Sequence, residues 1–198
     1  MDSGHHIKTW RPYSSGMVSL SSDFNLLATT ARGLESEASS ELWMLLRGLG
    51  DEGPSVGHAP VRGLILAKTS LDPLEAVGLL REELIRSPGD FRYLLRVIPI
   101  ESVVPTQLDG IAEAAQRLAS RIGEGESFRI TVEKRRTGLG SREVIEAVAS
   151  GIKRRVDLER PDWVVLIEIV GRYTGVSVLR PDSILNVQRL KAESAVDG

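Results

Sequence analysis

The chain has 198 residues and 41% of them are hydrophobic, which is enough for a folded core and excludes a wholly disordered chain. With 25 Lys and Arg against 27 Asp and Glu, the formal net charge is −2, which excludes a general polycation. No cysteine is present, so disulfides, Cys-ligated zinc and a thiol nucleophile are excluded, and we expect a reducing, cytoplasmic setting. Apolar runs such as 163–167 are far shorter than the roughly 20 residues needed to cross a bilayer, so no membrane partner is expected.

Positive charge is concentrated in one stretch of the chain. Residues 128–160 hold nine basic and five acidic side chains, a net charge of +4. The basic residues are Arg129, Lys134, Arg135, Arg136, Arg142, Lys153, Arg154, Arg155 and Arg160. A local basic patch on a near-neutral protein indicates an anionic partner at a defined place. On charge alone, a solvated face around 153–155 explains the pattern equally well.

The first half of the chain alternates strand and helix patterns after a tail at 1–20 that shows no periodicity. In chain order we expect a strand over 24–31, a helix from about 34 to 46, a strand over 61–68, a helix from an Asp72 N-cap to Pro88, and a strand over 91–100. One extra short strand within 51–68 would complete the order strand, helix, two strands, helix, strand. That order is typical of a ferredoxin-like domain.

The pattern restarts after Pro105 without a flexible linker. We expect a helix capped by Thr106 that reaches Ile122, a strand over 127–132 that continues into a basic triplet, a helix from a Ser141 N-cap to about Val156, a hairpin of strands 163–170 and 173–179, and a last strand-like piece at 184–190. The chain is therefore predicted to hold two modules, about 21–103 and 104–190.

The predicted strand end, the loop after it and the next helix together suggest a phosphate-binding site. Lys134, Arg135 and Arg136 supply charge at the strand end. Gly138 and Gly140 allow backbone amides to approach an anion, and the helix that begins at Ser141 offers unpaired N–H groups. Arg142 lies unfavourably near the positive end of that helix dipole, a conflict that a bound phosphate relieves. An ordinary turn is the alternative for the two glycines.

The sequence offers few candidate catalytic residues. The histidines are His5 and His6 in the tail and His58 in a loop, which is poor material for a catalytic triad or a metal site. Glu168 stands in a strand of β-branched residues, and either a polar sheet face or a salt bridge to a basic neighbour explains it better than catalysis. Aromatic residues make up only 5% of the chain, which argues against a base-stacking platform for single-stranded RNA. We expect no catalytic residues, no metal and no cofactor.

The stretch Ser127 to Leu179 resembles the THUMP domain, an RNA-binding domain of tRNA-modifying proteins. The motifs that carry this resemblance are SFRITVEKRR, SREVIEAVASGI and VDLERPDWVVLIEIVGRYTGVSVL. Near the start, FNLLATTARGLESEASSEL is similar to the ferredoxin-like domain that precedes THUMP in these proteins. The resemblance covers roughly 22–182. It implies an α+β fold, with an N-terminal ferredoxin-like domain followed by a THUMP domain that has a mixed sheet and flanking helices.

The resemblance also implies a function. Family members mostly join THUMP to a catalytic domain, but the chain has no SGGxDS loop, no NPPY motif and no cysteine for sulfur transfer. It is most similar to stand-alone THUMP adaptors, which bring tRNA to a separate RNA cytidine acetyltransferase that forms 4-acetylcytidine. The alternative is an RNA-binding subunit or fragment of a tRNA methyltransferase or of a 4-thiouridine-forming enzyme.

By the same resemblance, the RNA-binding residues are Lys134, Arg135 and Arg136, with Arg142 and Lys153 as nearby candidates for phosphate contact. The resemblance gives Asp157, Pro161 and Asp162 a structural role, as turn and cap.

Overall fold

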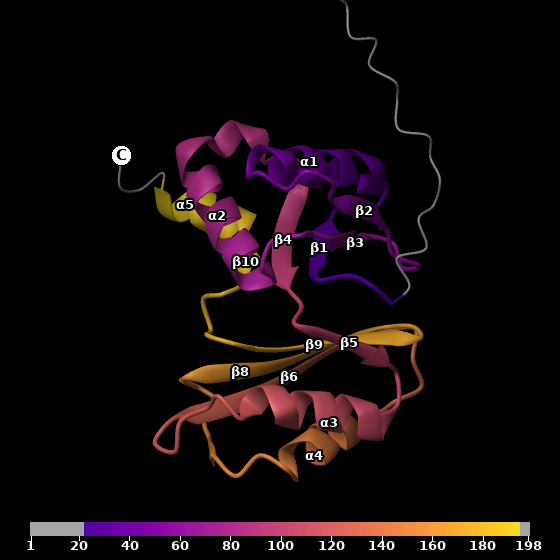
Figure 1. Cartoon of the computed structure of the whole chain (residues 1–198), viewed down its shortest axis with the longest axis vertical. Coiled ribbons are helices and arrows are strands. Elements are labelled where there is room, and N and C mark those ends of the chain that lie inside the picture. Colours follow the sequence, from indigo (N-terminus) through magenta and orange to yellow (C-terminus); the bar gives the residue numbers. More distant parts are fainter. Residues whose placement is uncertain (1–21, 195–198) are drawn as a thin grey trace, which may run out of the picture.

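A computed structural model describes residues 22–194 of the chain, which form two five-stranded sheets with helices on their outer faces (Figure 1). The predicted tail at 1–20 lies outside the described residues. The N-terminal elements are β1 (Leu26–Thr30), α1 (Glu35–Gly48), β2 (Ser55–His58), β3 (Leu64–Lys68), α2 (Pro73–Arg86), a 3-10 turn η1 (Pro88–Asp90) and β4 (Leu94–Pro99). No helix within 22–194 is both long and apolar enough to cross a membrane.

The N-terminal sheet confirms the ferredoxin-like order, including the extra strand within 51–68, which is β2. All of its strands are antiparallel, in the order β4-β1-β3-β2 followed across the sheet from β4. Helices α1 and α2 cover its outer face, where Leu42, Leu46 and Leu80 pack on Leu26 and Ile65. Asp72 caps α2 as predicted, because its carboxylate accepts the N–H groups of the two residues after Pro73.

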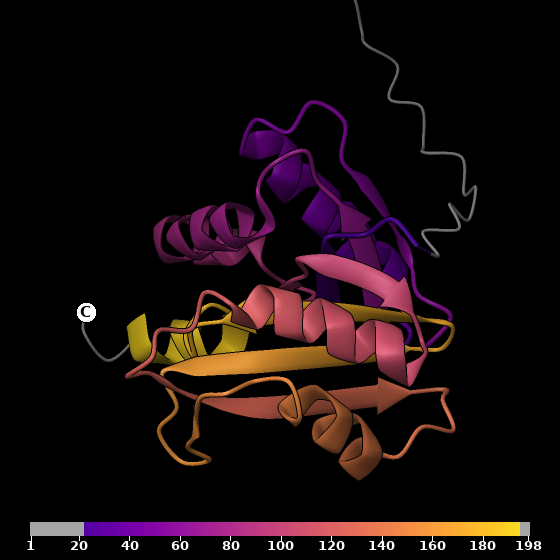
Figure 2. The ribbon, with the colours of Figure 1, turned by 60° about the horizontal axis from the view of Figure 1, so that its bottom comes forward.

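The C-terminal sheet is mixed, as expected. Its elements are β5 (Ser102–Pro105), α3 (Leu108–Ala119), β6 (Ser127–Arg135), α4 (Ser141–Ala149), β7 (Arg155–Val156), β8 (Trp163–Val170) and β9 (Tyr173–Leu179). The strand order is β5-β9-β8-β6-β7, with β6 parallel to β7 and β8 and the remaining pairs antiparallel. Figure 2 shows α3 and α4 together over one face of this sheet.

The two sheets pack face to face through a third apolar cluster. Leu27 and Leu66 from the N-terminal sheet meet Leu166 and Val170 from the C-terminal sheet, and all four are buried. Alternate residues of β1, β3 and β8 point to this cluster and to the outer cores, so both faces of each strand are covered. Gly175 allows the close approach, because a Cβ there would lie 3.0 Å from two carbon atoms of Ile100.

The chain returns to the N-terminal sheet after β9. The short strand β10 (Leu185–Asn186) pairs with β4, and α5 (Val187–Ser194) packs on α2. Residues 184–190 were expected to form one strand, and only the first part does so. The predicted module 104–190 includes this segment, whereas in the structure the buried side chains of Leu185 and Val187 join the N-terminal core.

Four predicted helix ends are wrong, and one of them is the C-terminal end of α3, which lies at Ala119 and not at Ile122. Thr106 does not cap α3, because its hydroxyl pairs with that of Thr174 at 2.9 Å and the N-cap is Gln107. The N-cap of α4 is Gly140, and Ser141 is its first helical residue. The same helix ends at Ala149 instead of about Val156, because the hydroxyl of Ser150 donates to the carbonyl of Ala147 and the chain then turns to bury Ile152.

Asp51 is a buried carboxylate that joins two loops of the N-terminal domain. It is 1% exposed and accepts hydrogen bonds from the Thr69 hydroxyl, from the N–H and hydroxyl of Ser70, each at 3.0 Å, and from the N–H of Gly53 at 3.1 Å. Burial alone would raise the pKa of Asp51, but these bonds together hold it below its ordinary value.

Replacing Asp51 with Ala is expected to lower the free energy of unfolding by about 3 kcal/mol, because buried donors lose a charged acceptor. Urea unfolding followed by circular dichroism measures the loss. Asp72→Ala is the comparison, since it removes an exposed helix cap worth about 1 kcal/mol. Equal losses in the two variants would contradict the buried role of Asp51.

Candidate nucleic-acid interface

The end of β6 reaches across to the N-terminal domain. Arg136, the residue after this strand, donates from Nη1 to the carbonyl oxygen of Pro60 in the loop between β2 and β3. Its backbone has φ of 55°, a left-handed conformation that is costly for a residue with a side chain. Arg136 is therefore held in an unfavourable conformation that keeps its exposed guanidinium beside the other domain.

Two further arginines from the N-terminal domain lie at this place. Arg32 follows β1 and Arg62 precedes β3, and the antiparallel pairing of these strands brings both to the same end of the sheet. The carboxylate of Glu35 accepts the N–H of Gly33 at 2.9 Å and that of Gly63 at 2.7 Å. These bonds, chiefly the one from Gly63, lower the pKa of Glu35. One carboxylate thus fixes both Arg-Gly turns.

Arg172 completes a cluster that we call the basic seam, which consists of Arg32, Arg62, Arg136 and Arg172. Arg172 stands in the turn between β8 and β9, next to Gly171, whose N–H donates to the carbonyl of Arg135 at 2.9 Å. All four side chains are exposed. Within residues 22–194 none of them has a carboxylate within ion-pair distance. The basic seam is therefore a candidate anion-binding surface to which both domains contribute.

Arg135 has a different environment from Arg136. Its Nη1 donates to Oε2 of Glu168 at 2.8 Å, and the Glu168 side chain is fully buried against the interface between the sheets. Burial raises the pKa of Glu168, while the bond from Arg135 and the nearby charge of Arg96 oppose the rise. Oε1 of Glu168 has no hydrogen-bond partner among the described residues. The predicted salt bridge of Glu168 is confirmed, and the charge of Arg135 is used inside the protein.

The loop after β6 is partly closed by its own side chains. Nζ of Lys134 donates to the carbonyl of Leu139 at 3.0 Å. The N–H of Gly140 donates to Oε2 of Glu143 at 3.2 Å, which places a carboxylate at the end of α4 where a phosphate was expected. A Cβ at Gly138 would meet no atom within 4 Å, so a side chain would fit there and no close contact of the protein requires glycine. The sites at Gly138, Gly140 and Ser141 stay predictions.

The two remaining candidates differ in position. Arg142 is 91% exposed and pairs with Glu146 at 2.7 Å, so its charge is partly neutralised. Lys153 follows α4 and lies near β7, which pairs with the first residues of β6. The basic triplet lies at the opposite end of that nine-residue strand, about 30 Å away at the usual rise per residue. The structure therefore does not bring Lys153 to the basic seam.

Asp157 and Asp162 act as turn and cap, in agreement with their expected roles. Asp157 accepts the N–H groups of Glu159 and Arg160 at 3.0 and 2.9 Å. Asp162 accepts the N–H and hydroxyl of Ser127 at 2.7 and 2.8 Å, and these bonds lower the pKa of Asp162. Both carboxylates order the strand starts of the C-terminal sheet.

The sequence reasoning missed Arg32, Arg62 and Arg172, because it looked for charge in a single stretch of chain. Two signals were present. Arg32-Gly33 and Arg62-Gly63 stand at the adjacent ends of two strands that pair in the predicted ferredoxin-like order. Their approach to β6 depends on the packing of the two sheets, which no local pattern reveals.

Comparison with known proteins identifies the second domain. Residues 105–179 match the THUMP domain, and they follow an N-terminal domain whose strands have the ferredoxin-like order. No curated protein sequence is significantly similar to it.

Solved structures share the fold of both domains. The crystal structure of PH1313 from Pyrococcus horikoshii superposes with a TM-score of 0.61 at 17% identity over 82% of this chain and 55% of that one. TrmN from Thermus thermophilus gives 0.54 at 22% identity over 87% and 49%. A 4-thiouridine synthetase in complex with RNA and ATP gives 0.54 at 12% identity over 83% and 42%. The chain spans about half the length of these proteins, and the likeness shows the fold alone.

Glu168→Gln should change how stability depends on pH. Because burial raises the pKa of Glu168 above 4.5, the protonated form favours the folded state, and this contribution is lost as pH rises through the raised pKa. We therefore expect the free energy of unfolding of wild type, relative to the variant, to fall as pH rises above 4.5 in urea titrations.

Glu126→Gln is the control for that measurement. The pKa of Glu126 is lowered, first by the N–H of Gly123 and then by Trp163 and Arg180. The free energy of unfolding of wild type, relative to this variant, must therefore increase as pH rises from the acid side. If the relative free energy of unfolding changed with pH in the same direction for both variants, the pKa of Glu168 would not be raised in the folded protein.

Proposed function

We propose that this protein binds tRNA through the basic seam and presents it to a separate RNA-modifying enzyme. The observation that carries the proposal is that arginines from both domains meet without an ion-pair partner among residues 22–194. Arg32 and Arg62 come from one domain, and Arg136 and Arg172 from the other. The match of residues 105–179 to the THUMP domain supports RNA as the anion, since THUMP is an RNA-binding domain of tRNA-modifying proteins.

The composition of the surface favours recognition of shape and backbone. Guanidinium groups make paired hydrogen bonds to phosphate oxygens, and such contacts position a nucleic acid without reading its sequence. With 5% aromatic residues the chain has few side chains on which to stack unpaired bases. A folded RNA that presents phosphates at a fixed spacing across two domains fits this surface better than an extended single strand.

The enzyme that we propose as the partner is an RNA cytidine acetyltransferase that forms 4-acetylcytidine, and this protein would itself be non-catalytic. The likeness of the sequence to stand-alone THUMP adaptors supports this choice. All helices and strands within residues 22–194 belong to the two domains. The sequence carries none of the catalytic motifs of the fused THUMP enzymes.

A second candidate is the RNA-binding part of a tRNA methyltransferase or of a 4-thiouridine-forming enzyme. The structural likeness to TrmN and to a 4-thiouridine synthetase favours it, together with the fact that the chain spans about half of each. In this case the basic seam has the same role, and the catalytic domain stands on another part of the protein or on another chain.

The basic seam is tested by combining Arg62→Ala with Arg136→Gly. Glycine at 136 removes the guanidinium but accepts the left-handed backbone, so folding is spared. We expect the affinity for tRNA to fall about tenfold and the slope of log K against log salt to lose about two units, one for each lost phosphate contact. Fluorescence anisotropy with labelled total tRNA at several salt concentrations measures both.

Arg189→Ala is the matched control, because Arg189 is an exposed arginine on α5 away from the basic seam and should leave binding unchanged. Arg142→Ala should change the affinity less than twofold, since Glu146 already neutralises that charge. Equal affinity for duplex DNA, or binding that does not weaken with salt, would contradict tRNA recognition by this surface.

The two candidate functions are separated by nucleoside analysis of tRNA from cells that lack the protein. Loss of 4-acetylcytidine, restored by wild type but not by the Arg62→Ala and Arg136→Gly variant, is expected for the adaptor. Loss of a methylated nucleoside or of 4-thiouridine would instead support the second candidate. Mass spectrometry of digested tRNA measures all of them at once.

A further inference from the structure

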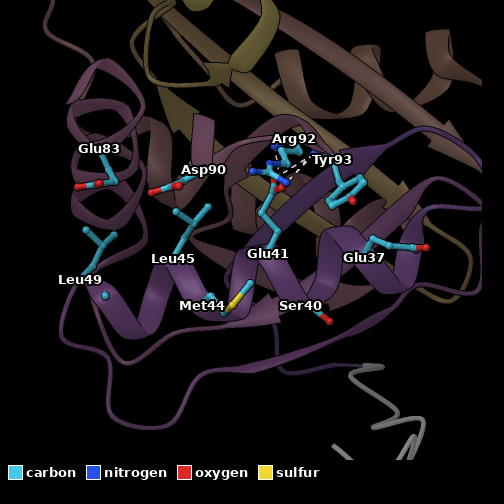
Figure 3. A pocket seen from close by; sticks show the side chains of 11 residues that line it. Glu37, Ser40, Glu41, Met44, Leu45, Leu49, Glu83, Asp90, Arg92 and Tyr93 are labelled. Carbon is cyan, nitrogen blue, oxygen red and sulfur yellow. Dashed lines mark hydrogen bonds between the residues drawn. The ribbon is translucent and has the colours of Figure 1, made fainter. Parts of the chain in front are cut away.

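A groove on the outer helical layer of the N-terminal domain takes no part in the proposed RNA binding. It runs along α1 and is bordered by the end of α2, by η1 and by the start of β4, with a cavity volume of about 720 Å³ (Figure 3). The basic seam lies where the two sheets meet, whereas α1 lies on the face of the N-terminal sheet that points away from the C-terminal domain (Figure 1). The two surfaces are therefore separate.

The floor of the groove is apolar and firmly supported. Leu45, Leu49 and Tyr93 belong to the N-terminal core or pack against it, so the floor is continuous with a close-packed interior. Met44 stands on the same side of α1 and is 61% exposed, although Leu45, the next residue along the helix, is buried. A large exposed methionine beside an apolar hollow is typical of a surface that receives another apolar group.

The rim of the groove is acidic. Glu37, Glu83 and Asp90 carry carboxylates around the floor, and Arg92 is the cation of the lining. Within residues 22–194, Glu37 and Asp90 have no ion-pair partner, while Glu83 pairs with Arg86 at 2.8 Å. A surface of this charge repels nucleic acid and attracts cationic side chains.

A fourth carboxylate in the groove is already used by the fold. Glu41 is buried and accepts the N–H groups of Arg92, Tyr93 and Leu94, with oxygen to nitrogen distances of 2.7 to 3.2 Å. It fixes the start of β4 against α1 and so sets the width of the groove. The acidic character that remains available to a ligand comes from the rim alone.

We propose that this groove docks a short segment of a protein partner that presents a large apolar side chain between lysines or arginines. The apolar group would lie on Met44, Leu49 and Tyr93, and the flanking cations would meet Glu37 and Asp90. The excess of carboxylates on the rim favours a cationic segment over RNA as the occupant. The inference goes beyond the proposed RNA binding and does not depend on it, because it rests on a different surface.

The test uses the full chain and three synthetic seven-residue peptides. The first has Leu-Trp-Leu between pairs of lysines, the second replaces the lysines with glutamates, and the third replaces Leu-Trp-Leu with serines. The readout is the ¹³C-methyl resonance of Met44, which is one of three methionines and is assigned with Met44→Leu. We expect the first peptide to shift this resonance and to bind at least tenfold more tightly than either of the others.

Variants of the groove give the second part of the test. Glu37→Lys combined with Asp90→Lys should weaken binding of the first peptide at least tenfold, and Glu193→Lys on α5 should not change it. Both variants should keep the tRNA affinity of wild type or exceed it, so failure of the groove is distinguishable from failure of the basic seam.

Two results would overturn the proposal. The first is a Met44 resonance that does not move with any peptide, or that moves equally with the lysine and glutamate peptides. The second is a dimer in sedimentation experiments that the first peptide dissociates, because the groove would then hold a second copy of this chain.

Discussion

The apolar contact between the two sheets is the constraint on which the rest of this structure depends. Leu27 and Leu66 on one sheet and Leu166 and Val170 on the other leave water together, so strands of both sheets are buried on both faces. This contact accounts for the nearly continuous apolar run of β8, because alternate residues of this strand are buried in two different cores. It also fixes the distance between strand ends that belong to different domains.

Around this contact, the charges of the strand ends divide into two roles. Arg135 turns inward to a buried carboxylate, where the desolvation of Glu168 makes the pair a weak source of stability and a strong constraint on geometry. Arg136 turns outward in a left-handed conformation and reaches Pro60. Adjacent residues thus supply an internal ion pair and a surface cation, a division that composition cannot reveal.

Local patterns predicted the local structure well. The Asp72 cap, the strand that runs into the basic triplet and the hairpin of β8 and β9 all follow from short-range rules that the tertiary fold does not oppose. Long-range contacts decided the rest. Leu185 joins a core built from residues far earlier in the chain, and Arg62 comes beside the end of β6 only because the sheets pack together. At the start of α4 the deciding contact is local, because Glu143 accepts the N–H of Gly140, three residues earlier in the chain.

The net charge of the chain is small, but its positive and negative side chains gather on different surfaces. Guanidinium groups gather where the domains meet, and carboxylates gather on the outer layer over α1 and η1. A polyanion approaching this protein is steered to one side by attraction and kept from the other by repulsion. In the proposed complexes, an RNA on the basic seam would therefore leave the apolar floor of the groove free for the protein segment.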